Sequence, residues 1–323
     1  MAWLDDIKDK VLGGESITGE DALRVSTAPF RELCKAANEI REHFCGNIFD
    51  VCTIVNAKSG KCSEDCKYCA QSSCYDTSIR EYPLMGVEAI LKQAKYCEGK
   101  GIHRYSIVTS GRNLTNAETE QICTAVRAVR EKSNISICAS LGLLEGDQFL
   151  KLKASGLTRI HNNLETSRGY FPKVCTSHTY ADKIVTILAA RRAGLSVCSG
   201  GIVGLGESME DRINMALELR RLAVRSVPVN ILNPIPGTPY ANNRQLTGKE
   251  ASRIVAVFRF LLPNAYIRLA GGRGLLEDKG RNCFLSGANA AISGDMLTTA
   301  GPGIDDDMKM LAELGYRVVL PDG

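Results

Sequence analysis

The sequence lacks several features that define other classes of protein. No apolar stretch approaches the length of a membrane span, and the N-terminal segment carries acidic residues instead of the apolar h-region of a secretory signal. No run of five or more basic residues occurs, and the formal net charge of +4 is scattered along the chain. We therefore expect a cytoplasmic protein with no membrane association and no nucleic-acid partner.

The chain also lacks any break in composition and any low-complexity segment. Its 323 residues exceed the usual size of one domain, but a single α/β barrel commonly reaches this length. Hydrophobic residues make up 44% and charged residues 24% of the chain, which is typical of a globular protein with an ample core. Nothing in the composition indicates a second independent domain.

Cysteine, in contrast, is abundant, with 13 residues. Without export these thiols stay reduced, so metal binding is favoured over a disulfide framework, and the odd number argues against complete pairing. Any one cysteine can also be a small buried apolar residue. We favour a packing role for five of them: Cys34, Cys45, Cys97, Cys123 and Cys283. Cys74 and Cys175 could approach a metal site, and their roles are left open.

Three further cysteines lie close together in the polar segment CSEDCKYCAQSS. A structural zinc site usually has four protein ligands and often pairs two C-x2-C arms, and no second arm follows at a finger-like distance. Three thiolates can instead hold three irons of a 4Fe–4S cluster and leave the fourth iron open to another ligand. The C-x3-C-x2-C spacing of Cys62, Cys66 and Cys69 therefore indicates an iron–sulfur centre that carries out chemistry.

The order of predicted elements indicates a barrel. Helices are expected in residues 1–45, with a capped start at Thr18. Strands are then expected in eight segments: 50–55, 104–110, 135–142, 158–165, 195–204, 227–233, 265–272 and 288–294. Because most of these alternate with amphipathic helical stretches, we predict a closed (β/α)8 TIM-type barrel with an N-terminal helical extension. The extension would cover residues 1–45, and the barrel with a C-terminal segment residues 46–323.

The predicted strands carry eight polar or sulfur-containing side chains, whereas a barrel interior is normally packed with branched aliphatic residues. If these residues point inward, a ligand or a metal is the reason. The alternative, that they point outward against the helices, is credible for any one of them and poor for all. They are Cys52, Ser106, Cys138, His161, Asn163, Cys198, Asn230 and Arg268.

The cysteine segment, with an aromatic residue just before its last cysteine, resembles that of the radical S-adenosylmethionine (SAM) superfamily. Within that superfamily, the order and spacing of CSEDCKYCAQSS, NNLETS, VCSGGIVGLGE, SVPVN, GTP, RLAGGR and LTT resemble biotin synthase over about residues 45–300. The resemblance implies insertion of sulfur into dethiobiotin to form the thiophane ring of biotin, with an auxiliary iron–sulfur cluster as the sulfur source. It also implies an electron donor such as flavodoxin or ferredoxin, and a homodimer.

The same resemblance implies which residues bind the cofactors. Cys62, Cys66 and Cys69 would hold the 4Fe–4S cluster, whose open iron takes the amino and carboxylate groups of SAM. Reductive cleavage of SAM would then give a 5′-deoxyadenosyl radical, so the protein's part is binding, orientation and exclusion of side reactions.

Six further residues match positions that surround SAM. Glu165 matches an acid that bonds the ribose hydroxyls, and Ile202 would pack on adenine beside the main chain of Tyr68. Lys183 lies where the family commonly has an arginine for the SAM carboxylate, and a lysine keeps the charge but loses the bidentate fork. Gly201 and Gly204 belong to a glycine-rich strand end where backbone can approach a ligand closely.

Four residues match the substrate site. Asn163 and Asn230 can satisfy both sides of a ureido group, because each amide donates and accepts. Thr298 and Thr299 match hydroxyls at the carboxylate end of dethiobiotin. The alternatives are capping of strand ends by the asparagines and an ordinary strand terminus at the threonines.

The auxiliary site departs from the pattern of the family, which has three cysteines and an arginine around a 2Fe–2S cluster. The second-strand cysteine is replaced here by Ser106, whereas Cys52 appears on the first strand. The ligands would then be Cys52, Cys138 and Cys198, which suits a four-iron cluster with one non-protein position that could bear an extra sulfide. The alternative is a 2Fe–2S cluster that Arg268 still ligates.

Two rival functions remain open at this point. One is another radical SAM enzyme of the same barrel subfamily, of the maturase or mutase type, which would not use dethiobiotin. The other is a non-enzymatic protein stabilised by zinc or by an iron–sulfur cluster, which would need closed ligation of the metal.

Overall fold

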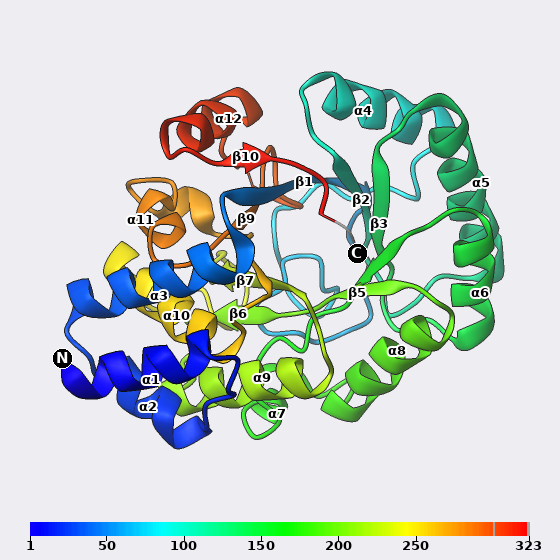
Figure 1. The fold of residues 1–323 in the computed structure, drawn as a ribbon. Helices are drawn as coiled ribbons and strands as arrows, with labels where there is room; N and C mark the ends of the chain where they lie inside the picture. The colour runs from blue at the N-terminus through cyan, green and yellow to red at the C-terminus, as the bar shows by residue number, and fades with distance from the viewer. Residues whose placement is uncertain (300, 322–323) are drawn as a thin grey trace.

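The computed structural model describes residues 1–299 and 301–321. The chain begins with three helices, α1 (Ala2–Leu12), α2 (Gly19–Ser26) and α3 (Phe30–Cys45). Thr18 caps α2 in a reciprocal pair of hydrogen bonds with Asp21, and α3 ends at Gly46, whose φ is 57°. The predicted helical extension is therefore present, and it lies against α9 and α10 on the outside of the barrel (Figure 1).

Parallel strands form the centre of the molecule. They are β1 (Ile48–Lys58), β2 (Arg104–Thr109), β3 (Ser136–Ser140), β4 (Arg159–His161), β5 (Ser196–Cys198), β6 (Gly201–Val203), β7 (Ser226–Ile231), β8 (Tyr266–Leu269) and β9 (Ala290–Ile292). Neighbours pair in this order, with both β5 and β6 on β7, and β9 pairs with β1 to close the barrel. A last short strand, β10 (Arg317–Val318), pairs with the start of β1.

The predicted closed barrel is therefore confirmed, and each of the eight predicted strand segments overlaps an observed strand. The one difference is that segment 195–204 forms two short strands, β5 and β6. Its interruption at residues 199–200 lies where the chain runs against the β7 backbone: a Cβ atom on Gly200 would be 1.9 Å from the Pro228 carbonyl oxygen.

Helices cover the outside of the barrel. They are α4 (Val87–Gly99), α5 (Asn116–Lys132), α6 (Gly146–Ala154), α8 (Tyr180–Arg192), α9 (Met209–Arg221) and α10 (Gly248–Leu261). Shorter elements lie in the loops and the C-terminal segment: α7 (Phe171–Val174), η1 (Arg273–Leu275), α11 (Arg281–Phe284) and α12 (Ile304–Glu313). Figure 1 shows the longer helices ringed around the strands. None of the described helices combines the length and the apolar character that a membrane span requires.

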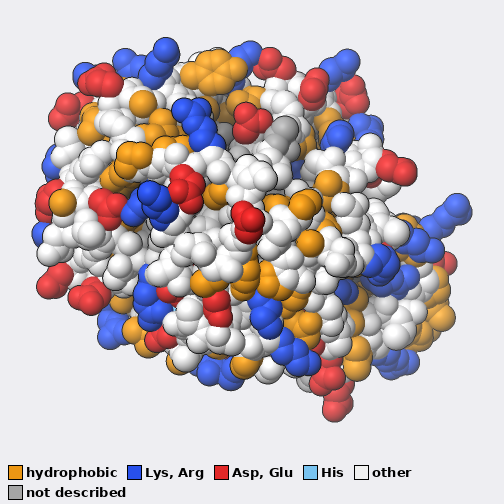
Figure 2. Space-filling model, turned by 180° about the vertical axis from the view of Figure 1, so that it is seen from behind, with side chains coloured by type: hydrophobic (Ala, Val, Ile, Leu, Met, Phe, Trp, Pro, Cys, Tyr) orange, Lys and Arg blue, Asp and Glu red, His pale blue; other side chains and the backbone are white. Residues whose placement is uncertain are grey.

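Alternation along each strand separates an apolar outer face from a polar inner one. In β2, for example, the fully buried Tyr105 and Ile107 belong to the core between strands and helices, whereas Arg104, Ser106 and Val108 line an internal cavity. On the outer surface of the molecule, acidic and basic side chains are interspersed over the face shown in Figure 2. The distinctive chemistry therefore lies inside the barrel.

Candidate functional site

A cavity of about 390 Å³ runs into the barrel from the end formed by the loops that follow the strands. All of the polar or sulfur-containing strand residues that the sequence singled out line it: Cys52, Ser106, Cys138, His161, Asn163, Cys198, Asn230 and Arg268. Their side chains thus point inward, as a ligand-binding interior requires. We describe the cavity from its mouth, formed by loops, to its floor, formed by the strands.

The cysteine loop lies at the mouth and is tied back on itself. The Cys62 N–H donates to the Gln71 carbonyl at 3.1 Å, and the Ser73 N–H donates to the Cys62 carbonyl at 2.8 Å. This pairing holds the loop in a compact turn between β1 and α4. As a result, Cys62, Cys66 and Cys69 all line the same cavity, where three thiolates can share one cluster.

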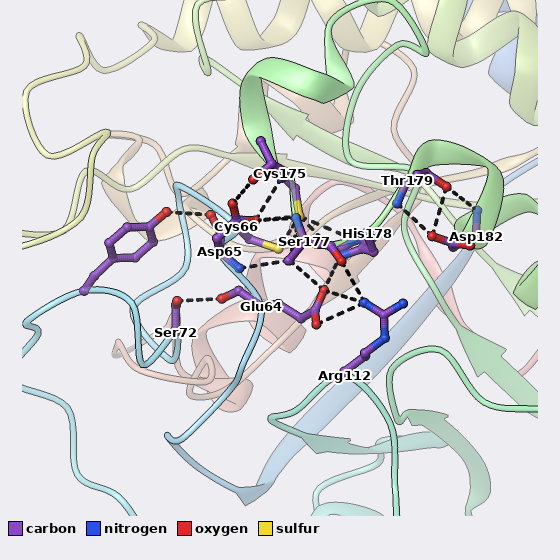
Figure 3. Close-up of polar contacts among 12 residues, drawn as sticks. Glu64, Asp65, Cys66, Ser72, Arg112, Cys175, Ser177, His178, Thr179 and Asp182 are labelled. Carbon is purple, nitrogen blue, oxygen red and sulfur yellow. Dashed lines mark hydrogen bonds and ion pairs between the residues drawn. The ribbon is translucent and has the colours of Figure 1, made fainter.

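Cys66 is supported from behind by a polar cluster, shown in Figure 3. Its Sγ is 3.7 Å from Cys175 Sγ, which in turn is 3.2 Å from both His178 Nδ1 and Asp65 Oδ1. The hydrogen bond between the two thiols lowers the pKa of Cys175 and raises the pKa of Cys66. The ligand atoms of Cys66, Cys175 and His178 lie within 4.8 Å of one another, a spacing that one metal ion could bridge.

The sequence left Cys175 without a role, and the structure places it next to a cluster ligand. Cys175 is buried and, although described, is not among the residues that line the cavity. It therefore supports the wall behind Cys66 and does not face the space where the open iron would bind a ligand. Glu64 joins this wall directly: its carboxylate accepts a hydrogen bond from the Ser177 hydroxyl at 2.8 Å and is in contact with His178.

Tyr68, Glu165 and Ile202 come together on one wall of the cavity. The Ile202 N–H donates to the Glu165 carbonyl at 2.8 Å, and Ile202 shares a small apolar cluster with Tyr68. Burial, with a further contribution from the Glu165 carboxylate, raises the pKa of the Tyr68 hydroxyl. Lys183 reaches the same cavity from α8. The wall thus offers an apolar surface, a carboxylate and a cation, which a nucleoside with an amino-acid tail requires.

The glycine-rich segment is explained by packing of the backbone. A Cβ atom on Gly200 would lie 1.9 Å from the Pro228 carbonyl oxygen, and one on Gly201 would lie 2.3 Å from the Glu165 carbonyl oxygen. Gly204 has a φ of 98°, which side chains rarely allow. Neither Gly201 nor Gly204, both of them described, lines the cavity. Their contact with SAM stays a prediction, and their observed role is close strand packing.

The four predicted substrate residues also line the cavity. Asn163 Oδ1 accepts a hydrogen bond from the Gly200 N–H at 3.1 Å, and the Asn230 amide bonds two backbone groups at 3.1 and 2.9 Å. Both asparagines therefore brace strand ends, as the alternative interpretation expected, and each retains further hydrogen-bonding capacity toward the cavity. Thr298 and Thr299 are exposed at its rim.

Cys52, Cys138 and Cys198 form the sulfur-rich part of the floor and come from β1, β3 and β5. Cys52 Sγ accepts a hydrogen bond from Arg268 at 3.2 Å, and Cys198 Sγ lies 3.5 Å from His161 Nδ1. Burial raises the pKa of Cys52 to about 12. For Cys198, burial acts in the same direction, but the hydrogen bond with His161 and the nearby cations outweigh it, so that its pKa is lowered.

Ser106 lies on β2 beside this group of thiols. It is the register partner of Cys138 on β3, and both side chains line the cavity. Burial raises the pKa of the Cys138 thiol, and the nearby Ser106 hydroxyl acts weakly in the opposite direction. A cysteine at position 106 would therefore stand next to Cys138.

Two arginines on the floor, Arg104 and Arg159, were not identified from the sequence. Both are almost fully buried and line the cavity. A signal was available, because each precedes a recognised inward residue by two positions: Arg104 lies two before Ser106, and Arg159 two before His161. Alternation therefore predicts that they face inward too.

Comparison with known proteins identifies the family. The profile described as "Radical SAM superfamily" matches residues 57–219, and that of the "Biotin and Thiamin Synthesis associated domain" matches residues 228–317. Biotin synthase of Brachyspira hyodysenteriae is 56% identical over 319 residues, which is 99% of this chain and 96% of the relative. The chain belongs to the biotin synthase family. Biotin synthase of Akkermansia muciniphila is also 56% identical, over 98% of this chain and 99% of the relative.

Solved structures agree with the barrel fold. Methylornithine synthase superimposes with a TM-score of 0.86 at 20% sequence identity, covering 97% of each chain. A maturase of the [FeFe]-hydrogenase superimposes with a TM-score of 0.82 at 18% identity, covering 99% of this chain and 76% of that one. At these identities the likeness shows the fold alone. The much higher identity to biotin synthases distinguishes this chain from the mutase and maturase alternatives.

Membership of the family makes the chain a radical SAM enzyme, which implies SAM and a 4Fe–4S cluster as cofactors. The residues at the mouth fit these groups, since three thiols, an apolar wall and a carboxylate converge there. The floor fits a second, anionic group, because buried guanidinium donors such as Arg159 NH1 have no hydrogen-bond partner within the described part of the chain. The prediction of a biotin synthase is confirmed.

Proposed function

We propose that this biotin synthase inserts sulfur into dethiobiotin inside the barrel, between a 4Fe–4S cluster at the mouth and a second iron–sulfur cluster on the floor. One observation carries the proposal: two groups of three cysteines line a single cavity. The loop cysteines Cys62, Cys66 and Cys69 lie at its mouth, and the strand cysteines Cys52, Cys138 and Cys198 lie on its floor. A substrate held between the two levels would meet a radical source on one side and a sulfur source on the other.

At the mouth, the loop thiols would hold the 4Fe–4S cluster, which when bound supplies the electron that cleaves SAM. The chain's own residues bind and orient the cofactor. Glu165 would accept hydrogen bonds from the ribose hydroxyls, and Ile202 and Tyr68 would cover the adenine. Lys183 would face the carboxylate of SAM as a point charge. Gly201 and Gly204 would act through the strand packing that places this wall.

In the middle of the cavity, the asparagine amides would position the ureido ring of dethiobiotin. Asn163 and Asn230 each keep donor or acceptor capacity beyond their bonds to the backbone, and the backbone bonds fix their side chains before the substrate arrives. The hydroxyls of Thr298 and Thr299 would bind the carboxylate tail at the rim.

On the floor, Cys52, Cys138 and Cys198 would ligate the auxiliary cluster. Thiolate is strongly preferred over hydroxyl at iron–sulfur clusters, so Ser106 is not expected to replace the missing cysteine. Three thiolates and one non-protein position favour a four-iron cluster with an extra sulfide, and a 2Fe–2S cluster with Arg268 is the alternative. Three further points stay predictions: an electron donor of the flavodoxin or ferredoxin type, a homodimer and a cytoplasmic location.

Iron analysis of the anaerobically reconstituted enzyme tests this arrangement. Wild-type protein should hold about eight irons per chain, as two four-iron clusters require. Cys52→Ser should lose the floor cluster and keep the other, so that 5′-deoxyadenosine still forms from SAM while biotin does not. Cys97→Ser is the matched control, because Cys97 is a buried cysteine of α4 outside the cavity.

Three outcomes would contradict the proposal. Biotin formation with unchanged iron content in Cys52→Ser would leave Cys52 as a packing residue. Loss of biotin formation in Cys97→Ser to the same degree would indicate general damage. Failure of dethiobiotin to stimulate 5′-deoxyadenosine formation by the wild-type enzyme would point to another substrate.

A further inference from the structure

The floor of the cavity contains an unusual group of buried charges. Three arginines, Arg104, Arg159 and Arg268, surround the single carboxylate of Asp50, and all four residues are at most 5% exposed. Asp50 Oδ2 lies 3.9 Å from Arg104 Nε and 3.7 Å from Arg159 NH1, and it is in direct contact with Arg268 NH2. One carboxylate therefore faces three guanidinium groups.

These charges do not balance within the protein. Three guanidinium groups and one carboxylate leave two positive charges in excess on the floor. Among the described residues, His161 is the other titratable nitrogen side chain there, and the remaining polar side chains of the floor are thiols and hydroxyls. Buried charge without a partner is strongly unfavourable, so the excess requires negative charge from an occupant or from the thiols.

The three arginines are not equivalent. Arg268 has partners at both terminal nitrogens: NH1 lies 3.1 and 2.9 Å from the Asp50 and Ala291 carbonyls and 3.2 Å from Cys52 Sγ, while NH2 contacts the Asp50 carboxylate. In contrast, Arg104 Nε and Arg159 NH1 are buried nitrogen atoms that have no hydrogen-bond partner among the described residues. The free donors thus belong to Arg104 and Arg159.

The strand register places these two arginines beside the thiols. Cys52 on β1 is the register partner of Arg104 on β2, and Cys138 on β3 is the register partner of Arg159 on β4. Partners in adjacent parallel strands point to the same side of the sheet, about 4.8 Å apart. Each of these two thiols therefore has a cation next to it at the same level of the barrel.

We propose that Arg104 and Arg159 are positioning residues that hold the auxiliary cluster by compensating a charge near −2, and that Arg268 is an ion-pair partner of Asp50 and not an iron ligand. This inference rests on the auxiliary cluster of the proposed function. A cluster with three thiolates and one additional anionic ligand has about this charge, and the donors of Arg159 can bond its sulfur atoms.

The consequence for electron affinity has a definite sign. A cation beside a cluster stabilises the reduced form, because reduction adds negative charge. Removal of the positive charge at residue 159 should therefore shift the midpoint potential of the floor cluster to a more negative value. The potential of the cluster at the mouth should not change, because its ligands come from a separate loop.

The experiment uses anaerobically reconstituted full-length enzyme with Arg159→Gln, Arg159→Lys and Arg127→Gln. Arg127 is an exposed arginine of α5 and serves as the matched control. Potentiometric titration followed by electron paramagnetic resonance should give a negative shift for Arg159→Gln, a smaller shift for Arg159→Lys, and none for Arg127→Gln. If Arg159→Gln also lowers the iron content toward four per chain, the role in holding the cluster is supported directly.

Arg268 is tested without any substitution, by incorporating arginine labelled with 15N in its guanidinium group. We expect only weak 15N hyperfine coupling to the reduced floor cluster, and a strong coupling of the kind given by a ligating nitrogen would overturn this part. Full iron content with an unchanged potential in Arg159→Gln would overturn the role of Arg159 alone. About four irons per chain in the wild-type enzyme would instead show that it holds no auxiliary cluster, and this inference would then be wrong as well.

Discussion

Replacement of Asp50 by asparagine offers a quantitative test of the buried charges. The substitution preserves shape but removes the one carboxylate that, among the described residues, faces the three floor arginines, so the positive excess rises from two charges to three. Removing one partner of a buried ion pair typically costs ~3–5 kcal/mol, because the other partner is left buried and uncompensated. Asp50 is completely buried, so solvent offers little screening.

This cost can be converted into a melting temperature. With an unfolding entropy of about 2.1 cal/mol/K per residue, a chain of 323 residues has about 0.7 kcal/mol/K, and the loss corresponds to a fall of about 4–7 °C in Tm. Calorimetry of the cluster-free protein measures it. Reconstitution with iron and sulfide should reduce the difference in Tm between Asp50→Asn and wild type. An anionic cluster compensates the additional positive charge on the floor, and its binding stabilises the native state.

Asp307→Asn is the control for this experiment. Asp307 is buried as well, but among the described residues its ion-pair partner is Arg273, and neither of these two side chains lines the cavity. It should lower Tm by a similar amount, and reconstitution should leave that difference unchanged. A cluster-free Asp50→Asn protein that melts at the wild-type temperature would refute the charge argument. If reconstitution changed the Tm of Asp50→Asn and Asp307→Asn equally, the stabilisation would not depend on the charge of the floor.

Three further predictions concern other parts of the cavity. Cys69→Ala should abolish formation of 5′-deoxyadenosine from SAM while the circular dichroism spectrum stays that of the wild type, and retained formation would contradict the role of the loop. Gly200→Ala should destabilise the protein by ~1–3 kcal/mol or more, because its Cβ would lie 1.9 Å from the Pro228 carbonyl, whereas Gly248→Ala, with no atom within 4 Å, should change stability by less than ~1 kcal/mol. Urea unfolding compares the two glycine variants, and equal midpoints would contradict the packing argument. Asn230→Ala should raise KM for dethiobiotin and also lower the free energy of unfolding in urea by ~1–3 kcal/mol, since two backbone groups lose their partner; an unchanged free energy of unfolding would exclude the bracing role.

Much of the fold could be predicted because each element carries a local signal. The helix beginning after Thr18 follows from its capping pattern, and the barrel follows from the alternation of short β-branched runs with amphipathic helices. Inward-facing residues could be predicted for the same reason, since the side-chain period of a strand is two. The loop cysteines needed no knowledge of the fold, because their spacing alone brings the three thiols together.

Contacts between distant strands could not be predicted in this way. The sequence does not show that Gly200 lies against the Pro228 carbonyl, a contact that explains this glycine by strand packing. It does not show that the amides of Asn163 and Asn230 are already bonded to backbone groups. Such contacts depend on the closure of the barrel and on the register of strands far apart in the chain.

The register also shows where Cys52 lies relative to a cysteine at position 106, which is serine in this chain. Ser106 on β2 is paired with Ile54 on β1, whereas Cys52 is paired with Arg104, one inward position closer to the start of the strand. The thiol of Cys52 therefore does not occupy the place that a cysteine at 106 would have; it lies one step deeper, next to Arg268. A ligand set that includes Cys52 encloses a different volume from one that includes residue 106. A floor with Cys52 and Ser106 therefore differs in shape from one with a cysteine at position 106.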